Sequence, residues 1–340
     1  MSLETFWLAL LGLLLAGYFV LGGYDYGVQM LHPFLRGDRE TAERTGDNAA
    51  LDAMAPFFLG NEVWLVAFAG VMFGAFPHLE GTLLSGLYPL IVAILVGLVL
   101  GNAAIQLRRR AHTARARRWW EALIVLGGAL PALCWGLVVG LLLRGVPRRA
   151  DGSFHLGFGD VFSPFVLACG MTFALLLAAH GAAFVALRST PDIAARAAQL
   201  GAALLRATGA VACLPPLLTL FGAGASMTNR ATSAVLAALL AAVLAGAWWA
   251  AVRAHRVRAF AATGCAAVLL VLLVGAGQYP YLLTSSTGAG LTIDEAVTDD
   301  ATMKILTAFG VVLIPVILTY QSMSWWVFRG RTGRRHPGYF

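Results

Sequence analysis

A few ionisable and amide side chains lie inside long apolar runs of the sequence, and these residues could do chemistry. Asp25 lies in the first run, Asn61 and Glu62 lie in the second, and Asn102 and Gln106 lie near the end of the third. Ionisable groups inside a bilayer are costly and by default indicate function. Together these residues could form a proton path or a polar joint to a partner, with Glu62 kept neutral by desolvation or charged by a donor. They could equally form a structural network that ties three helices together, through contacts worth about 0.6–2 kcal/mol each.

His180 is the only histidine well inside an apolar run, which raises the question of a haem. With a methionine such as Met171 it could ligate haem iron, but it cannot supply the paired histidines of a typical membrane b-type haem. We therefore interpret His180 as a hydrogen-bonded core histidine. The four cysteines lie in apolar runs without the spacing of a metal site. The sequence thus predicts no metal site and no directly bound haem, and any chemistry at a cofactor is expected in another chain.

The composition indicates a membrane protein in contact with lipid. Apolar residues make up 59% of the 340 residues and charged residues 12%, and the mean hydropathy is +0.77. The formal net charge is +7, but the arginines gather in short segments between apolar runs, where they orient helices. Nucleic acid is therefore not expected as a partner.

Nine apolar runs approach the length of about 20 residues that crosses the hydrocarbon core as a helix. Glu4 precedes the first run and no basic segment opens it, so we interpret this run as an uncleaved helix. Pro215 and Pro216 should kink the sixth span. We predict an all-α integral membrane protein, a single polytopic domain over residues 1–340. Its spans are predicted at 6–31, 54–76, 82–107, 119–143, 161–187, 200–221, 234–252, 259–275 and 303–328.

Basic residues alternate from loop to loop, and this alternation predicts the orientation. Arginines follow the first, third, fifth, seventh and ninth spans, whereas acidic residues gather before the ninth. The arginine-rich segments are predicted to be cytoplasmic, with the N-terminus outside and the C-terminus inside, which an odd number of spans requires. The arginines concerned are Arg36, Arg39, Arg44, Arg108, Arg109, Arg110, Arg115, Arg117, Arg118, Arg188, Arg196, Arg253, Arg256, Arg258, Arg329, Arg331, Arg334 and Arg335.

Several stretches resemble subunit II of the cytochrome bd quinol oxidases. They are residues 17–28, 56–65, 73–77, 180–182, 186–188, 279–282, 285–286, 291–293 and 326–328, with Pro315, Tyr320 and Gln321. The resemblance implies two four-helix bundles plus one additional helix, with the N-terminal bundle in residues 1–143 and the C-terminal helices in 161–328. It also implies a place in the prokaryotic plasma membrane, in a heterodimer with a subunit I that carries two b-type haems and one d-type haem. That partner oxidises quinol and reduces oxygen to water, while the present chain, itself haem-free, supports assembly. A bound quinone and a small accessory subunit are further components that the resemblance allows.

The departures from the family pattern gather around the polar residues. The pattern has an acid at Gly22, Trp-Asp at Phe58-Leu59, an arginine at Gly101 and an acid at Gln106. Removing one member of a buried charge cluster leaves the others unpaired, at a cost of about 3–5 kcal/mol. The loss of all these charged residues together avoids that cost. The proton path therefore stays open as a hypothesis. Residues that match the pattern are Asp25, Asn61 and Glu62, together with the structural motif residues Gly60, Trp64 and Arg108.

Two other functions compete with a subunit of an active quinol oxidase. The chain could be a purely structural or assembly subunit without a proton or electron role, and the missing charges favour this alternative. It could instead be a secondary transporter, with a solute bound near the middle of the bundle. The lack of paired helices broken by Gly or Pro in corresponding halves argues against a transporter.

Overall fold

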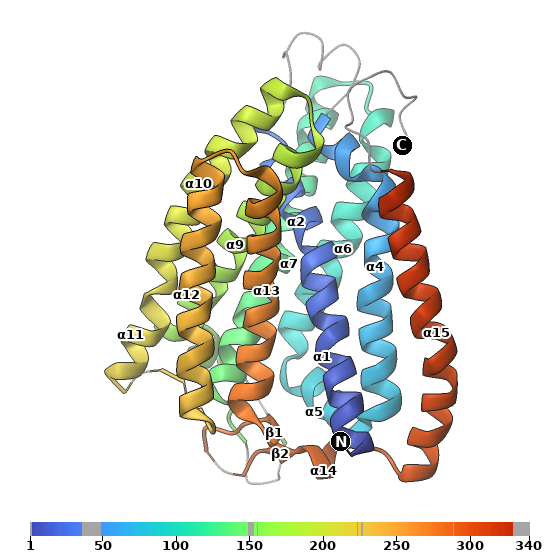
Figure 1. The fold of residues 1–340 in the computed structure, drawn as a ribbon, viewed down its shortest axis with the longest axis vertical. Helices are drawn as coiled ribbons and strands as arrows, with labels where there is room; N and C mark the ends of the chain where they lie inside the picture. Colours follow the sequence, from blue (N-terminus) through green and yellow to red (C-terminus); the bar gives the residue numbers. More distant parts are fainter. Residues whose placement is uncertain are drawn as a thin grey trace.

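The chain folds into nine long helical spans within the residues that the structure describes. This structure is a computed structural model that describes residues 2–35, 49–148, 153–154, 156–222, 224–225, 227–287 and 289–328. Nine of its helices or helix pairs are long and apolar enough to cross a membrane, and they run side by side along the molecule (Figure 1). The prediction of an all-α membrane protein of about nine spans is therefore confirmed.

Seven of the spans are single helices and two are pairs of helices. The spans are α1 (Leu3–Leu21) with α2 (Gly23–Leu31), α4 (Ala49–Ala75), α6 (Tyr88–Leu107), α7 (Ala114–Arg144), α9 (Pro164–Arg188), α10 (Pro191–Ala212) with α11 (Leu214–Leu220), α12 (Arg230–Val252), α13 (Arg256–Gln278) and α15 (Asp300–Val327). The short elements are α5 (Pro77–Gly86), η1 (Arg108–Arg110), α8 (Phe158–Val161), α14 (Ile293–Ala296), β1 (Tyr281–Leu283) and β2 (Leu291–Thr292).

The third predicted span is shorter than expected. Residues 82–86 belong to α5, and α6 begins only at Tyr88, after a turn at Leu87. Pro89 explains the new start, since proline is tolerated in the first turn of a helix but not in its interior. The sixth span begins earlier than predicted, at Pro191, and it breaks at Cys213 just before the two prolines, which confirms the predicted kink.

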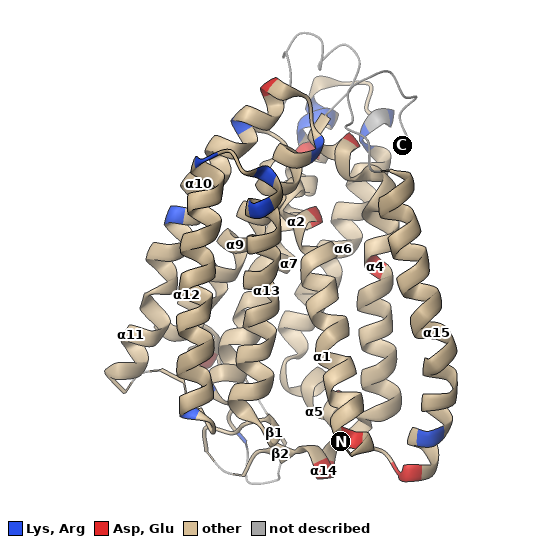
Figure 2. Cartoon of the chain, viewed as in Figure 1, with Lys and Arg blue, Asp and Glu red and all other residues tan. Residues whose placement is uncertain are grey.

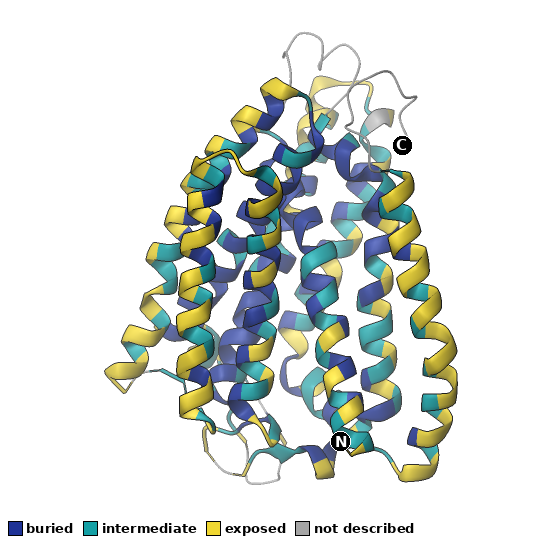
Figure 3. Ribbon diagram, in the orientation of Figure 1, coloured by how far each residue is buried: buried dark blue, intermediate teal, exposed yellow. Residues whose placement is uncertain are grey.

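The first four spans pack as one group and the next four as another, while α15 stands apart. Helices α2, α7 and α9 contact one another and join the two groups, whereas α15 packs mainly against α4. Figure 3 shows buried residues concentrated in these central helices and mostly exposed residues along α15. The arrangement agrees with two four-helix bundles plus one additional helix. The limits of the two halves, residues 1–143 and 161–328, stay a prediction.

Glycine pairs allow the central helices to approach closely. A Cβ atom added at Gly181 of α9 would lie closer than 3 Å to the backbone of Gly27 in α2, and one added at Gly136 of α7 would lie 2.8 Å from the Cα of Gly170 in α9. Without a hydrophobic driving force in lipid, helices associate through close packing of this kind. These crossings therefore fix the positions of α2, α7 and α9.

The two ends of the bundle differ in charge. Figure 2 shows most of the described arginines at the end away from the N-terminus, and acidic residues at the other end around α14 and the start of α15, where Lys304 also lies. At that acidic end, β1 and β2 pair in antiparallel fashion. The predicted basic residues Arg36, Arg39, Arg44, Arg329, Arg331, Arg334 and Arg335 lie outside the described residues.

Two carboxylates cap the short helix α14 and the last span. The backbone N–H and the hydroxyl of Thr292 each donate to Glu295 over 2.9 Å, which holds the pKa of Glu295 below its usual value. The hydroxyl and the N–H of Thr302 donate to Asp299 over 2.7 and 3.0 Å, and lower the pKa of Asp299. Because each pKa is lowered, each cap stabilises the folded protein fully at a pH above the ordinary pKa of its acid. This stabilisation is lost as the pH falls through the lowered pKa.

The glycine crossing gives a direct test of the packing. Gly181→Ala should push α9 away from α2 and lower the apparent melting temperature of the purified protein, since overpacking costs about 1–3 kcal/mol. Gly246→Ala is the matched control on α12, because a Cβ added there meets nothing within 4 Å. Equal melting temperatures for the two variants would contradict the close crossing.

Candidate functional site

The first span is interrupted at Gly22, just before the residues of the candidate site. α1 ends at Leu21 and α2 restarts at Gly23, with Gly22 between them. Two adjacent glycines weaken a helix, because glycine is the least favourable residue in a helix interior apart from proline. The interruption places Tyr24 and Asp25 in the first turn of α2, and both side chains are buried.

His180 of α9 bonds to the backbone at this interruption. Its Nε2 lies 2.8 Å from the carbonyl oxygen of Val20, and its Nδ1 lies 2.7 Å from the hydroxyl of Thr263 in α13. A carbonyl can only accept, so Nε2–H donates to Val20, while Nδ1 pairs with the Thr263 hydroxyl, which also lies within 3.0 Å of the carbonyls of Ala259 and Phe260. The ring also stacks on Phe260, with 4.7 Å between centroids. Both ring nitrogens are engaged, so the geometry agrees with a core histidine and offers no free axial ligand for haem iron.

Asn61 of α4 connects three spans through its amide. Its Nδ2 donates to the hydroxyl of Tyr24 over 2.7 Å and to Oδ2 of Asp25 over 2.9 Å. Its Oδ1 accepts from Nε2 of Gln321 in α15 over 3.2 Å. The four side chains are all buried. Asn61 thus uses its donor and acceptor atoms to hold α2, α4 and α15 together.

Glu62 makes a separate pair with Asn102 of α6. Nδ2 of Asn102 donates to Oε1 of Glu62 over 2.5 Å, in a part-buried setting. Consecutive residues point about 100° apart around a helix of 3.6 residues per turn. Asn61 therefore faces α2, whereas Glu62 faces α6. The polar residues form two hydrogen-bonded groups and not one cluster.

The structure leaves other predicted residues outside these two groups. Gln106 lies one turn beyond Asn102 on α6, is exposed, and hydrogen-bonds to no described residue. Nη2 of Arg108 lies 3.4 Å from Oδ1 of Asp52. This contact lies at the arginine-rich end of the bundle, where α6 ends and α4 begins. Because α4 begins at Ala49, Glu62 lies 13 residues, or about 20 Å, from that end of the helix.

Gly60 and Trp64 serve packing in this region. The indole of Trp64 fills the space above Gly17 of α1, where any added Cβ would collide with it. A Cβ added at Gly60 would lie 3.3 Å from the ring of Tyr320 in α15. Both motif residues therefore set the contacts of α4 with neighbouring spans.

Three residues of the site were missed by the sequence analysis. Tyr24 and Gln321 are direct partners of Asn61, and both stood inside stretches that carry the family resemblance. Gln29 fills the space beside Gly101: a Cβ added there would lie 2.5 Å from Oε1 of Gln29. That position is where the family pattern has an arginine, so here a neutral amide and the close approach of α6 to α7 replace a charge.

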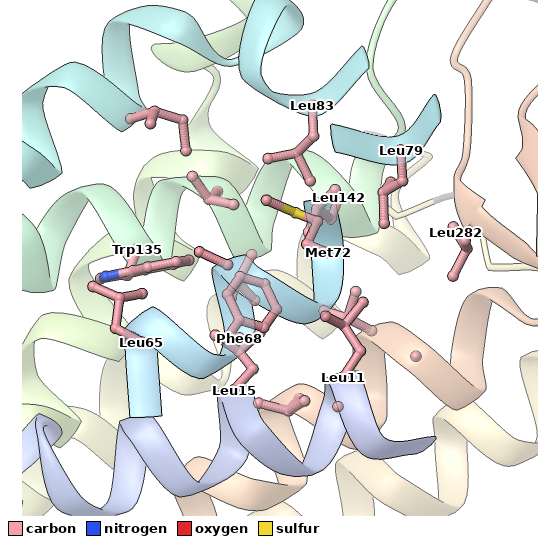
Figure 4. Close-up of a pocket in the computed structure, with 18 of the residues that line it drawn as sticks. Leu11, Leu15, Leu65, Phe68, Met72, Leu79, Leu83, Trp135, Leu142 and Leu282 are labelled. Carbon is pink, nitrogen blue, oxygen red and sulfur yellow. The ribbon is translucent and has the colours of Figure 1, made fainter. Parts of the chain in front are cut away.

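An apolar cavity of about 350 Å³ lies beyond these polar groups, toward the acidic end of the bundle. Side chains from α1, α4, α5 and α7 converge on it, as Figure 4 shows for Leu11, Phe68, Met72, Leu83 and Trp135. Its volume falls in the range of about 300–1,000 Å³ that is usual for ligand pockets. Walls of this kind suit a hydrocarbon or isoprenoid chain.

The fold and these groups define a class of protein: a polytopic helical membrane protein with two hydrogen-bonded polar groups in its first helix group. Among the described residues, no group of three or more His, Cys, Asp or Glu side chains could hold a metal ion. The sequence model of the family described as cytochrome bd terminal oxidase subunit II matches residues 3–328. The chain belongs to this family, and the resemblance carried by its motifs is confirmed.

Relatives of known name are similar over nearly the whole chain. Cytochrome bd ubiquinol oxidase subunit 2 of Bacillus subtilis is 29% identical, over 99% of this chain and 98% of that protein. Cytochrome bd-I ubiquinol oxidase subunit 2 of Escherichia coli is 28% identical, over 97% of this chain and 95% of that protein. A solved bd oxidase structure from Geobacillus thermodenitrificans has the same fold, with a TM-score of 0.71 at 20% identity, and the match covers 96% of this chain and 99% of that one.

The position of His180 predicts a structural role that can be separated from haem binding. His180→Ala leaves the carbonyl of Val20 without its donor and should lower the stability of the purified oxidase by about 1–3 kcal/mol. Its haem content per complex, measured from the pyridine haemochrome spectrum, should not change. His112→Ala is the control, because His112 is exposed. Loss of one haem in His180→Ala would show that the ring is a ligand.

Proposed function

We propose that the chain is the haem-free second subunit of a quinol oxidase of the aerobic respiratory chain, in the plasma membrane of a prokaryote. The family match over residues 3–328 carries this proposal. The engagement of both nitrogens of His180 within the chain supports it, since the deepest histidine is not free for a haem. The two b-type haems and the d-type haem then belong to subunit I, which oxidises quinol and reduces oxygen to water.

The flank formed by α4 and α6 is the surface we propose for contact with subunit I. Leu59, Val63 and Val66 of α4 and Val99 of α6 are exposed there, and Glu62 is only part-buried beside them. Lipid would solvate such a carboxyl group poorly, so a partner that covers it lowers the cost of keeping it in the membrane. A small accessory subunit would have to bind elsewhere on the complex.

The two polar groups suggest a route for protons toward this flank. Asp25 and Asn61 lie inside the bundle, and Glu62 with Asn102 lies at its edge, so an acid that exchanges its proton could deliver it to the partner. The rival interpretation, a purely structural subunit, has support as well: Asn61 has partners on two other helices, and Gln29 lies beside Gly101, where we expect an arginine in the family. Variants of Glu62 distinguish the proton route from the purely structural role.

Glu62→Gln keeps the hydrogen-bonding shape but cannot release a proton. If Glu62 transfers protons, this variant should assemble with full haem content and lose oxygen consumption per haem by about tenfold or more. Glu62→Ala leaves the amide of Asn102 without its hydrogen-bond acceptor and should reduce both assembly and turnover. Glu4→Gln at the opposite end of the bundle is the control. Wild-type turnover in Glu62→Gln would leave Glu62 with a structural role alone.

The orientation is a second proposal that can be tested on intact cells. With the arginine-rich segments in the cytoplasm, a membrane-impermeant maleimide should label Ala301→Cys and should fail to label Ala114→Cys until the membrane is opened. Both positions are exposed, one at the start of α15 and one at the start of α7. The reverse labelling pattern would place the N-terminus inside.

The apolar cavity of the first bundle is the place we propose for any quinone that this chain binds. Its walls from α1, α4 and α7 would hold the isoprenoid tail. Quinol that reacts is oxidised in subunit I, so a quinone in this cavity would have a structural role.

A further inference from the structure

A second cavity, of about 600 Å³, lies in the second helix group, among α9, α10, α11, α12 and α13, and α7 of the first group completes its wall. Its walls are almost entirely apolar. The hydroxyl of Thr172 donates to the carbonyl of Ala168 over 2.7 Å, and the thiol of Cys213 donates to that of Gly209 over 3.2 Å. A buried water needs two to four polar partners, and these groups are already bonded within their own helices. The interior suits a hydrocarbon chain.

The two prolines of the sixth span create this space. α10 ends at Ala212, and α11 begins at Leu214, with Pro215 and Pro216 in its first turn. Because proline cannot continue a regular helix, the chain changes direction, and Figure 1 shows α11 diverging from α12. Both prolines line the cavity. The gap is therefore fixed by the backbone.

Arg206 of α10 is the one charged residue among the described residues that line this cavity. It is exposed, and it forms no ion pair with any described residue. It lies 15 residues after Pro191, about 22 Å along a span of 30 residues. A guanidinium in such a place is costly unless it reaches the headgroup layer or meets an anion.

The cavity opens to the surrounding lipid between α10 and α12. Arg206 on one side and Ala241 and Trp248 on the other line it and are exposed. Trp248 lies four residues before the end of α12 at Val252, and tryptophan favours the boundary between membrane and water. Arg206 and Trp248 therefore mark the opening on the side of the arginine-rich segments.

We propose that this cavity binds an anionic phospholipid, with one acyl chain between α10 and α12 and the phosphate on Arg206. A guanidinium donates two parallel hydrogen bonds to a phosphate, which a planar fork of donors favours. The positive charge of Arg206 selects a lipid of net negative charge over a zwitterionic one. This site lies in the second bundle, away from Glu62, and does not depend on the proposed proton route.

The test measures lipid binding by the assembled two-subunit complex, purified in mild detergent and stripped of loosely held lipid. The probe is phosphatidylglycerol with a pyrene-labelled acyl chain. Arg206→Gln should weaken its binding about tenfold, since hydrogen bonds to charged groups are the strong ones. Ala241→Phe should weaken binding to a similar extent by filling the cavity. Wild-type complex should bind the labelled phosphatidylglycerol more tightly than the matching phosphatidylcholine.

Matched variants separate loss of the site from loss of the fold. Ala242→Phe adds the same ring at a neighbouring exposed residue outside the cavity wall, and Arg253→Gln removes an arginine that does not line it. Both should bind like wild type, and Arg206→Lys should weaken binding less than Arg206→Gln, because lysine keeps the charge but loses the bidentate fork. Wild-type binding by Arg206→Gln or Ala241→Phe would overturn the proposal. So would equal affinity for the two lipids, or recovery of an isoprenoid quinone in place of phospholipid.

Discussion

A bilayer offers no water to a free backbone carbonyl, so any interruption of a spanning helix has to be satisfied from within the protein. The first span is interrupted at Gly22, and the carbonyl of Val20 next to it accepts from His180. Thr263 fixes the ring from α13. The residue after His180 is Gly181, which lets α9 approach α2 at Gly27. The crossing brings the histidine within reach of the carbonyl, and the bond in turn holds the two helix groups together.

The same constraint explains why amides replace charges in the polar layer. Asn61 bonds to Tyr24, Asp25 and Gln321, and these contacts tie the otherwise exposed helix α15 to the bundle. Where the family pattern has an arginine, Gly101 lets α6 approach α7 and Gln29 takes the remaining space. An amide carries no charge and so avoids the desolvation cost of a buried ion. Glu62 departs from this rule at the edge of the bundle, where a second protein can cover it.

The outer surfaces of the two helix groups have different chemistry. The flank of α4 and α6 presents apolar side chains around a part-buried acid, which suits a protein partner. The opening between α10 and α12 presents Arg206, which forms no ion pair within the described part of the chain, beside an apolar cavity, and this suits a lipid of opposite charge. The difference follows from the sequence of each helix: an acid at the edge of the first group is costly in lipid unless it is covered, whereas an arginine at the edge of the second is costly unless it meets an anion or the headgroup layer.

The sequence by itself determined the fold class, the approximate spans, the kink at Pro215 and Pro216 and the family, because apolar run length and motif residues are local properties. It also singled out Asp25, Asn61, Glu62 and His180. Tertiary structure alone decided which of them meet. Asn61 and Glu62 are neighbours in the chain but face different helices, and Gln106, close to Asn102 in sequence, faces outward. Those outcomes depend on helix rotation and on the glycine crossings, which set the distances between side chains far apart in the sequence.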